Sequence, residues 1–376
     1  MTAAWKAPLL PQDASGSAAW RLGACGWSSK LIVNLAQRML YPFSHHVAVL
    51  YGVSLPAVGA VLAGMQFTST ITPVLMPRLL RAVGHRAALA VTGFLHTGAL
   101  FLVAWSVAFA LLGGALLVLG AAMGAFYAVW QAATTFYVAK EWRGTVVAWV
   151  ETSWGASGLL GMPLFGLVIA AEGWGRGYTA LAALSAVSHT ALLCSLPARG
   201  TTDGQAKAQR TEPDHGQEQG SCLAGCRVLC ASPLAMAIIL GASSTAGSSA
   251  LLFAFGPWLQ QDEGWSLKAV AKATGVLGTA DMVGELLLAA LLRPGRDPLA
   301  VVVPAMLATA VVGTMLPICA HQGSPMLGLT AFFGFEVAFE VALVSIMASS
   351  CVHEVPGHPG VLESAVMMSI GAGATV

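Results

Sequence analysis

Six ionisable side chains lie inside stretches of this chain that are otherwise apolar enough to cross a lipid bilayer. They are Arg38, Glu151, Asp281, Glu285, Glu336 and Glu340. A charge at the depth of the hydrocarbon is costly unless it faces a partner or a water-filled cavity. The six charges therefore predict a polar interior between membrane-spanning helices. A carboxylate there that alternates between an arginine partner and an apolar environment can bind and release a proton.

Three of these charges are predicted to form one layer. Counted from the expected helix ends at about 1.5 Å per residue, Arg38, Glu151 and Glu285 all lie roughly 10 Å from the cytoplasmic side. A cation between two carboxylates at one level predicts a buried network. That network either carries protons through Glu151 or Glu285, or only holds three helices together.

Two further carboxylates form an acidic pair. Glu336 and Glu340 are one helical turn apart and therefore share a face, near the bilayer midplane where solutes bind in many carriers. Asp281 and Glu285 have the same spacing. Because like charges repel, at least one acid of each pair is expected to be protonated or to bind a cation. Proton coupling, a cationic solute and hydrogen bonding to neighbouring helices remain three interpretations of Glu336 and Glu340.

Aromatic side chains accompany the charges and could contact an organic solute by stacking or cation–π attraction. Those expected near the interior are Tyr41, Phe43, Tyr127, Trp130, Tyr137 and Trp154. A ring close to a helix end is more typical of an interface anchor, an explanation that does not suit Tyr127, Trp130 or Trp154. Tyr41 and Trp154 are assigned to the candidate solute site.

The composition is that of an integral membrane protein. Of 376 residues, 56% are apolar and 9% are charged, and the mean hydropathy is +0.74, whereas soluble domains carry about 25% charged residues. The net charge of +1 gives no reason to expect a nucleic-acid partner. No His/Asp or Ser/His/Asp arrangement has a spacing useful for catalysis. We therefore predict no enzyme, no cofactor and no metal site.

Apolar stretches of the roughly 20 residues that a spanning helix requires occur eleven times, the last cut off by the end of the chain. They lie near 31–52, 55–77, 87–109, 111–139, 145–171, 178–196, 232–260, 266–292, 298–320, 324–352 and from 360 onward.

This pattern predicts four regions. Residues 1–30 are a polar N-terminal segment, and 31–196 are a first half of six helices. The Gln- and Gly-rich stretch 197–231 cannot bury a core and is predicted to be a flexible cytoplasmic linker. Residues 232–376 are an incomplete second half with helices 7–11.

The basic residues predict the orientation. With the N-terminus in the cytoplasm, the inner segments hold fourteen Lys and Arg residues, the outer loops hold three, and Arg38 lies within the first span. An excess of cations on the inner side is typical of membrane proteins. We therefore predict a cytoplasmic N-terminus, and the plasma membrane and an organelle membrane stay open.

The two halves repeat a spacing of glycines. Gly144 and Gly155 are eleven residues apart in the first half, as are Gly360 and Gly371 in the second. Internal repeats of this kind are typical of secondary carriers. A complete repeat would contain a twelfth helix, so we expect the natural product to be longer or the gene sequence to be incomplete.

Several motifs are similar to those of one transporter family. They are RMLYPF at 38–43, GVSLPAVG at 52–59, Arg143 with Glu151 and Trp154, GMPLFG at 161–166, GELL at 284–287 and GFE at 334–336. Over 31–376 the chain resembles the major facilitator superfamily, in a branch with Arg-x-x-Tyr-Pro-Phe in helix 1 and Gly-Phe-Glu in helix 10. The resemblance implies an all-α polytopic membrane protein whose two six-helix halves rock about a central site.

One loop departs from the family pattern. The stretch PRLLRAVGHR at 77–86 retains Gly84 and Arg86, but Arg81 stands where the family has an acid. The resemblance implies a gating loop that latches the cytoplasmic side by charge pairs. That latch is in doubt here because its acid is replaced.

These features predict secondary active transport of a small solute by alternating access. Coupling to protons is favoured because acids inside the spans can titrate and no sodium motif is evident. The alternative is a membrane sensor or scaffold that derives from a transporter and no longer transports. The altered loop at 77–86 and the missing twelfth helix favour that alternative.

Overall fold

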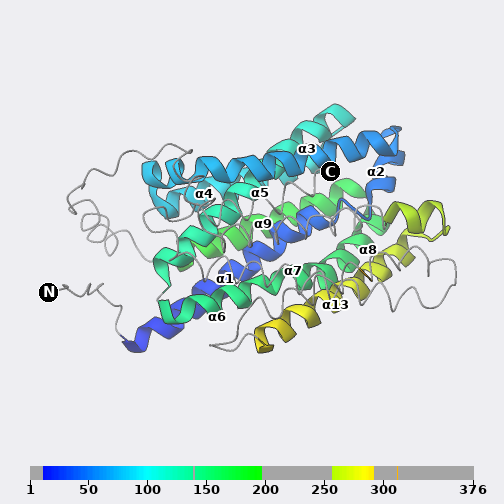
Figure 1. Cartoon of the computed structure of the whole chain (residues 1–376). Coiled ribbons are helices and arrows are strands. Elements are labelled where there is room, and N and C mark those ends of the chain that lie inside the picture. Colours follow the sequence, from blue (N-terminus) through cyan, green and yellow to red (C-terminus); the bar gives the residue numbers. More distant parts are fainter. Residues whose placement is uncertain (1–11, 139, 197–255, 292–310, 312–376) are drawn as a thin grey trace.

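The computed structural model describes residues 12–138, 140–196, 256–291 and 311, and the elements within them are helical (Figure 1). The longer helices are α1 (Gln12–Arg38), α3 (Leu55–Ile71), α4 (Met76–Ala104), α5 (Phe109–Tyr137), α9 (Trp174–Ser195) and α13 (Leu267–Leu291). The shorter ones are α2 (Ser44–Tyr51), the 3₁₀ turn η1 (Thr72–Leu75), α6 (Lys140–Glu151), α7 (Ser153–Ala156), the π-helical turn η2 (Ser157–Gly161) and α8 (Met162–Glu172). Residues 256–261 form a further helical turn ahead of α13.

Five stretches of the described residues are long and apolar enough to cross a membrane. They are Leu55–Leu80, Ala82–Ala104, Phe109–Thr134, Trp149–Glu172 and Trp174–Ser195. Each overlaps one of the spans predicted between 55 and 196, and α13 coincides with the span predicted at 266–292. The predicted linker 197–231 and the spans predicted after 292 lie outside the described residues.

The first predicted span is wrong in its boundaries. A continuous helix was expected over 31–52, but α1 begins at Gln12 and ends at Arg38, and α2 resumes only at Ser44. Pro42 lies in the break and has no N–H to donate to a helical ladder. Residues 12–30, expected to be a polar segment, are therefore the first part of a helix that packs beside α6 and α9.

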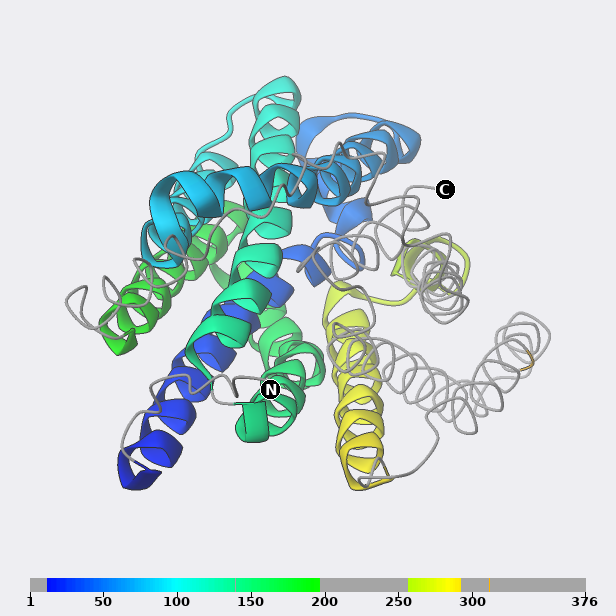
Figure 2. The same cartoon turned by 60° about the vertical axis from the view of Figure 1, so that its left-hand side comes forward.

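The fifth span is segmented. Helix α6 ends at Glu151, Thr152 forms a turn, and the π-helical turn η2 separates α7 from α8. Helix α13 packs along α7, η2 and α8, as Figure 2 shows. At this crossing a Cβ on Gly158 would lie 2.8 Å from the Cα of Gly278. Small residues of this kind allow two membrane helices to approach at backbone distance.

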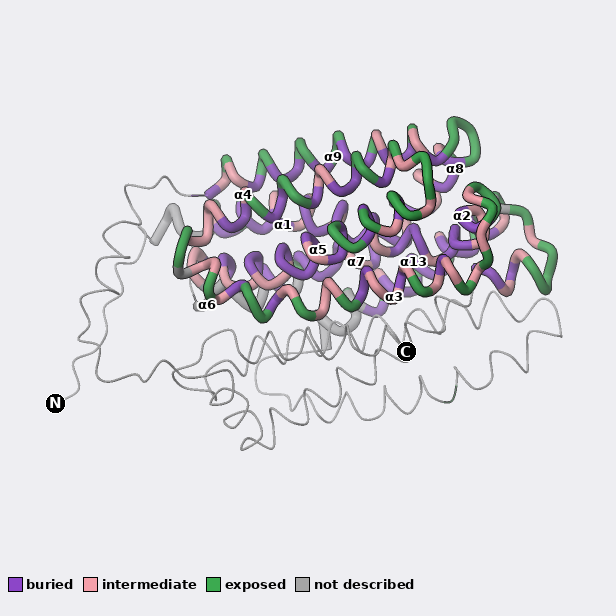
Figure 3. Tube along the Cα trace, turned by 90° about the horizontal axis from the view of Figure 1, so that it is seen from above, coloured by how far each residue is buried: buried purple, intermediate pink, exposed green. Residues whose placement is uncertain are grey.

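In the first half of the chain, α1 packs against α9 and α6, α4 packs against both α5 and α9, and α3 packs against α5. Figure 3 shows buried positions between the helices and exposed positions along their outer sides. The outward side chains are largely apolar, with Phe94 83% exposed, because the solvent of a spanning helix is lipid. Two glycines of α5 turn inward, since Gly120 and Gly124 face the backbone carbonyls of Met65 and Ser69 on α3.

The α3–α5 crossing yields a prediction about stability. Gly120→Ala should lower the melting temperature of the detergent-solubilised protein by a few degrees, because the new methyl group collides with the Met65 carbonyl, and overpacking costs about 1–3 kcal/mol. Gly114→Ala, on the same helix, is the matched control because nothing lies within 4 Å of its Cβ. Equal melting temperatures for the two variants would contradict the close packing of α3 against α5.

Candidate functional site

Helix α1 carries a line of buried polar side chains into the interior. Lys30, Asn34 and Arg38 follow one another at four-residue spacing and are all buried, so they share one face of the helix. That face lies toward the segmented fifth span and toward α13. The sequence interpretation missed Lys30 because it placed the residue before the first helix, although the spacing to Arg38 could have revealed it.

Arg38 joins α1 to α13. Its Nη2 lies 2.5 Å from Oδ2 of Asp281, and the exposed fractions of the two side chains are 5% and 2%. Its Nη1 donates a hydrogen bond of 2.9 Å to the backbone carbonyl of Trp154. Its guanidinium carbon lies 4.8 Å from the centroid of the Trp154 ring. The first half of the chain therefore holds the arginine, and α13 supplies the carboxylate.

The predicted pairing of Arg38 with Glu151 is wrong, and the predicted pairing of Arg38 with Glu285 is not tested. Glu151 pairs with Lys30, at 2.5 Å between Oε2 and Nζ. Arg38 pairs instead with Asp281, which the sequence interpretation left unplaced. Depth was counted from helix ends, and α1 begins well before the end that was assumed. The side chain of Glu285 is outside the described part of the structure, as are residues Glu336 and Glu340, so their roles stay predictions.

A hydrogen-bond chain lies between the two ion pairs. Asn34 donates from Nδ2 to Oγ of Ser153 at 3.0 Å and accepts at Oδ1 from the Tyr127 hydroxyl at 2.6 Å. The Lys30 ammonium lies 5.8 Å from the centroid of the Tyr127 ring. Both the amide nitrogen and the amide oxygen of Asn34 therefore have a hydrogen-bond partner. They tie α1 to α5 and to the start of α7, which suits a rigid wall better than a mobile element.

Tyr41 and Trp154, the two aromatic residues assigned to a solute site, differ in whether their polar groups already have hydrogen-bond partners. The hydroxyl of Tyr41 accepts a hydrogen bond from Nε2 of Gln66, so this ring bridges the break after α1 to α3. Trp154 stacks on Arg38, and its Nε1 is buried with no hydrogen-bond partner among the described residues. A buried donor without a partner is costly. Of the two residues, Trp154 is therefore the one whose polar group has no partner among the described residues.

The predicted gating loop forms a sharp turn. Gly84 has φ 78° and ψ 167° inside α4, a left-handed conformation that favours glycine. The next residue, His85, stacks on Phe136 with 4.6 Å between ring centroids, which fixes the turn against the end of α5. Arg86 is half-buried, and the side chain of Arg81 is outside the description. The chain therefore turns sharply at Gly84, and the role of this loop as a gate stays a prediction.

Two buried histidines lie together in the first half of the chain. His96 on α4 and His189 on α9 are both buried, with 3.4 Å between Nδ1 of His96 and Nε2 of His189. Ser185 also contacts His96 Nδ1, at 2.9 Å.

Within the described ranges no three His, Cys, Asp or Glu side chains converge as metal ligands.

The chain is similar in sequence and in fold to known proteins. A family model described as Major Facilitator Superfamily matches residues 26–376. A solved proton:xylose symporter bound to 6-bromo-6-deoxy-D-glucose superposes with a TM-score of 0.71 at 14% identity, over 96% of this chain and 86% of that one. A D-xylose-proton symporter gives 0.70 at 11% identity, over 95% and 88%. No curated protein sequence matches significantly.

The buried Lys30–Glu151 pair predicts an asymmetry between single and double substitutions. Lys30→Met should destabilise the protein strongly, because an uncompensated buried carboxylate costs about 3–5 kcal/mol. Adding Glu151→Gln to Lys30→Met should restore much of the stability, since no charge is then left unpaired. Melting temperature and yield of monodisperse protein in detergent measure both effects.

The exposed pair of Arg176 and Glu172 is the matched control for this experiment. Arg176→Gln should leave the melting temperature unchanged, because exposed ion pairs contribute little. A double variant no more stable than Lys30→Met would show that Glu151 is not the partner left unpaired.

Proposed function

Because the chain belongs to the major facilitator superfamily, whose members are membrane transporters, we propose that it moves a small solute by alternating access and couples that movement to protons. The protein is a multi-pass membrane protein of the two-halved transporter fold. The observation that carries the proposal is the Arg38–Asp281 ion pair, which is buried and joins α1 of the first half to α13 of the second.

The Arg38–Asp281 pair lies where it would have to open when the two halves of the chain move against each other. When two halves rock against each other, contacts between α1 and α13 must change. Opening the pair while both groups are charged would leave two buried charges without partners, which is strongly unfavourable. Protonation of Asp281 removes one charge, and Arg38 keeps the Trp154 carbonyl and ring as partners. A proton on Asp281 therefore lowers the cost of separating α1 from α13.

Two roles follow for the named residues. Asp281 is the group that binds and releases the proton, and Arg38 sets whether that carboxylate is paired. This differs from the sequence hypothesis, which gave the proton to Glu151 or Glu285. Glu151 is less suited because Lys30 and the hydrogen-bond chain at Asn34 hold its surroundings within the first half.

The class of solute is suggested by the similar structures and by one side chain. Both solved structures are named as xylose–proton symporters, and one is bound to a halogenated deoxyglucose. The free Nε1 of Trp154 is a donor that could bind a hydroxyl oxygen of such a solute. A neutral, hydroxylated small molecule is the solute class that we propose.

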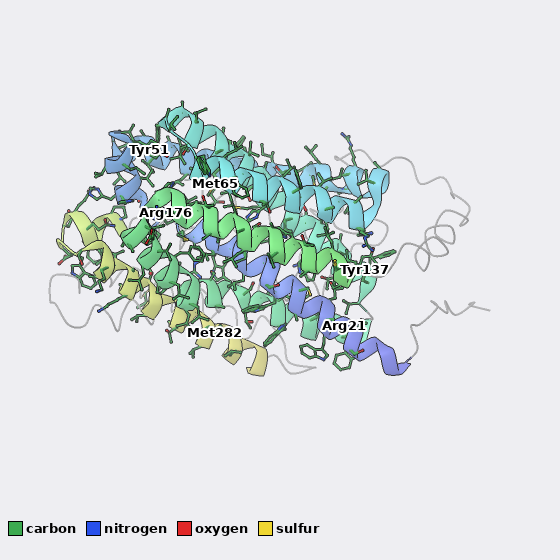
Figure 4. All side chains as sticks on the ribbon, turned by 180° about the vertical axis from the view of Figure 1, so that it is seen from behind. Arg21, Tyr51, Met65, Tyr137, Arg176 and Met282 are labelled. Carbon is green, nitrogen blue, oxygen red and sulfur yellow. The ribbon has the colours of Figure 1, made fainter. Side chains whose placement is uncertain are left out.

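The distribution of Lys and Arg along the sequence supports a cytoplasmic N-terminus. Arg21 lies toward one end of the bundle together with Tyr137, and Arg176 lies toward the other end with Tyr51 (Figure 4). Lys30 was counted among the inner loops but is a buried partner of Glu151. Without it, thirteen cations remain on the proposed inner side against three outside (14 − 1 = 13), so the bias persists.

A non-transporting sensor or scaffold is the second candidate, and the arginine at position 81 favours it. The glycine turn at Gly84 is retained, which favours transport. Uptake by proteoliposomes under a pH gradient separates the two candidates. The scaffold predicts no flux of xylose or of any member of a broad panel of neutral solutes.

Substitution of Asp281 tests the coupling. Asp281→Asn should reduce solute accumulation driven by a pH gradient by tenfold or more, because the amide cannot carry a proton. Exchange of labelled for unlabelled solute without a gradient should continue. Glu172→Gln, which changes an exposed carboxylate at the outer end, should leave both activities intact. Uphill accumulation by Asp281→Asn at the rate of the unaltered protein would remove Asp281 as the proton carrier.

Substitution of Trp154 tests the solute contact. Trp154→Phe keeps an aromatic ring beside Arg38 but removes the free N–H donor. Loss of one hydrogen bond worth about 0.5–1.5 kcal/mol should raise the KM for exchange severalfold with little change in maximal rate. An unchanged KM for every transported solute would show that Nε1 does not bind it.

A further inference from the structure

Four tryptophans line the neighbouring helices α1 and α6. Trp20 and Trp27 on α1 are seven residues apart, as are Trp142 and Trp149 on α6. The Trp20 ring lies 6.4 Å from that of Trp142 and 6.3 Å from that of Trp149 between centroids. Trp27 and Trp149 are stacked at 6.3 Å. The rings therefore form one continuous aromatic row along the contact between the two helices.

Three of these side chains present a surface. Trp20 is 42% exposed, Trp142 36% and Trp149 43%, and together with Arg21 they are called the tryptophan face below. Trp27 differs because its Nε1 donates to the Thr152 hydroxyl at 3.0 Å. Within the described ranges, the indole N–H groups of the three exposed tryptophans have no acceptor. The face thus offers apolar rings and unused donors at the same place.

The tryptophan face lies toward the end of the bundle at which α1 begins. Helix α1 has 27 residues, so at 1.5 Å per residue it is about 40 Å long, which exceeds the roughly 30 Å of hydrocarbon in a bilayer. Trp20 lies ten residues before Lys30, about 15 Å nearer the N-terminal end. The remaining exposed tryptophan of the described residues, Trp105, directly follows α4. The exposed large apolar side chains within α4 are Phe, Leu and Val instead.

The positive charge of Arg21 favours an anionic partner for the tryptophan face. Arg21 directly follows Trp20 and is exposed, and it has no ion-pair partner among the described side chains. A guanidinium group binds phosphate through paired hydrogen bonds. Indole rings prefer the headgroup level of a bilayer, with the ring in the ester region and the N–H toward polar atoms. Anionic lipids are enriched in the cytoplasmic leaflet.

We propose that the tryptophan face binds an anionic phospholipid of the leaflet on the N-terminal side. The indole N–H groups of Trp20, Trp142 and Trp149 donate to ester oxygens, and Arg21 binds the phosphate. The bound lipid covers the contact between α1 and α6 and so supports the position of the helix that carries Lys30 and Arg38. This inference does not depend on the proposed transport of a solute.

The test uses the full chain in nanodiscs that contain phosphatidylcholine and phosphatidylglycerol in equal amounts. Bromine, which quenches tryptophan fluorescence, is placed near the ester groups of one lipid or of the other. We expect stronger quenching when the phosphatidylglycerol carries the bromine. Trp20→Phe with Trp142→Phe and Trp149→Phe should abolish the difference between the two lipids.

Arg21→Gln separates headgroup binding from simple anchoring. It should remove the preference for phosphatidylglycerol while the quenching by brominated phosphatidylcholine persists. Arg176→Gln, at the opposite end, is the matched control and should retain the preference. Because Arg21 is exposed, this variant should fold even if the triple variant does not.

Three results would overturn the proposal. One is equal quenching by both lipids in the unaltered protein, which would indicate an interface anchor without headgroup binding. A second is a preference for phosphatidylglycerol that survives Arg21→Gln. A third is a disulfide-linked dimer of the Trp20→Cys variant, which would assign the face to a second copy of the chain.

Discussion

The ion pair between Arg38 and Asp281 is the interaction on which the arrangement of the described halves depends. In a lipid environment neither group can find a partner outside the protein, so α1 and α13 must lie where the two side chains meet. The backbone makes this possible. Gly158 and Gly278 allow the helices to approach closely, and the π-helical turn η2 falls at the same crossing. π-Helical turns are frequent at functional sites.

The second buried pair has a different part in the structure. Lys30 and Glu151 both belong to the first half, and Asn34, Tyr127 and Ser153 extend their contacts across three helices. Such a network can stay intact while the halves move. The molecule therefore contains one ion pair within the first half and one that connects α1 to α13. In the proposed transport cycle only the second pair must open, which is why we propose Asp281 rather than Glu151 as the proton-binding group.

Much of the fold was predictable because hydropathy is a local property. The spans predicted between 55 and 196 lie within about five residues of the five apolar stretches that are observed, and the span predicted at 266–292 coincides with α13. The first span was not predictable in the same way. Residues 12–30 are rich in Ala, Gly and Trp rather than in long aliphatic residues. They are helical because they pack beside α6 and α9, and that packing is not a property of the segment alone.

The sequence by itself determined that charges lie inside the membrane, and which residue types they are, because their apolar flanks are read directly from the chain. Only the tertiary structure decided their partners. Pairing depends on the rotation and depth of helices that are far apart in the sequence. Helix α1 begins at Gln12, so Lys30 lies within the helix and pairs with Glu151. Arg38 pairs with Asp281 instead, because this is the carboxylate that the packing of α13 brings within hydrogen-bond distance.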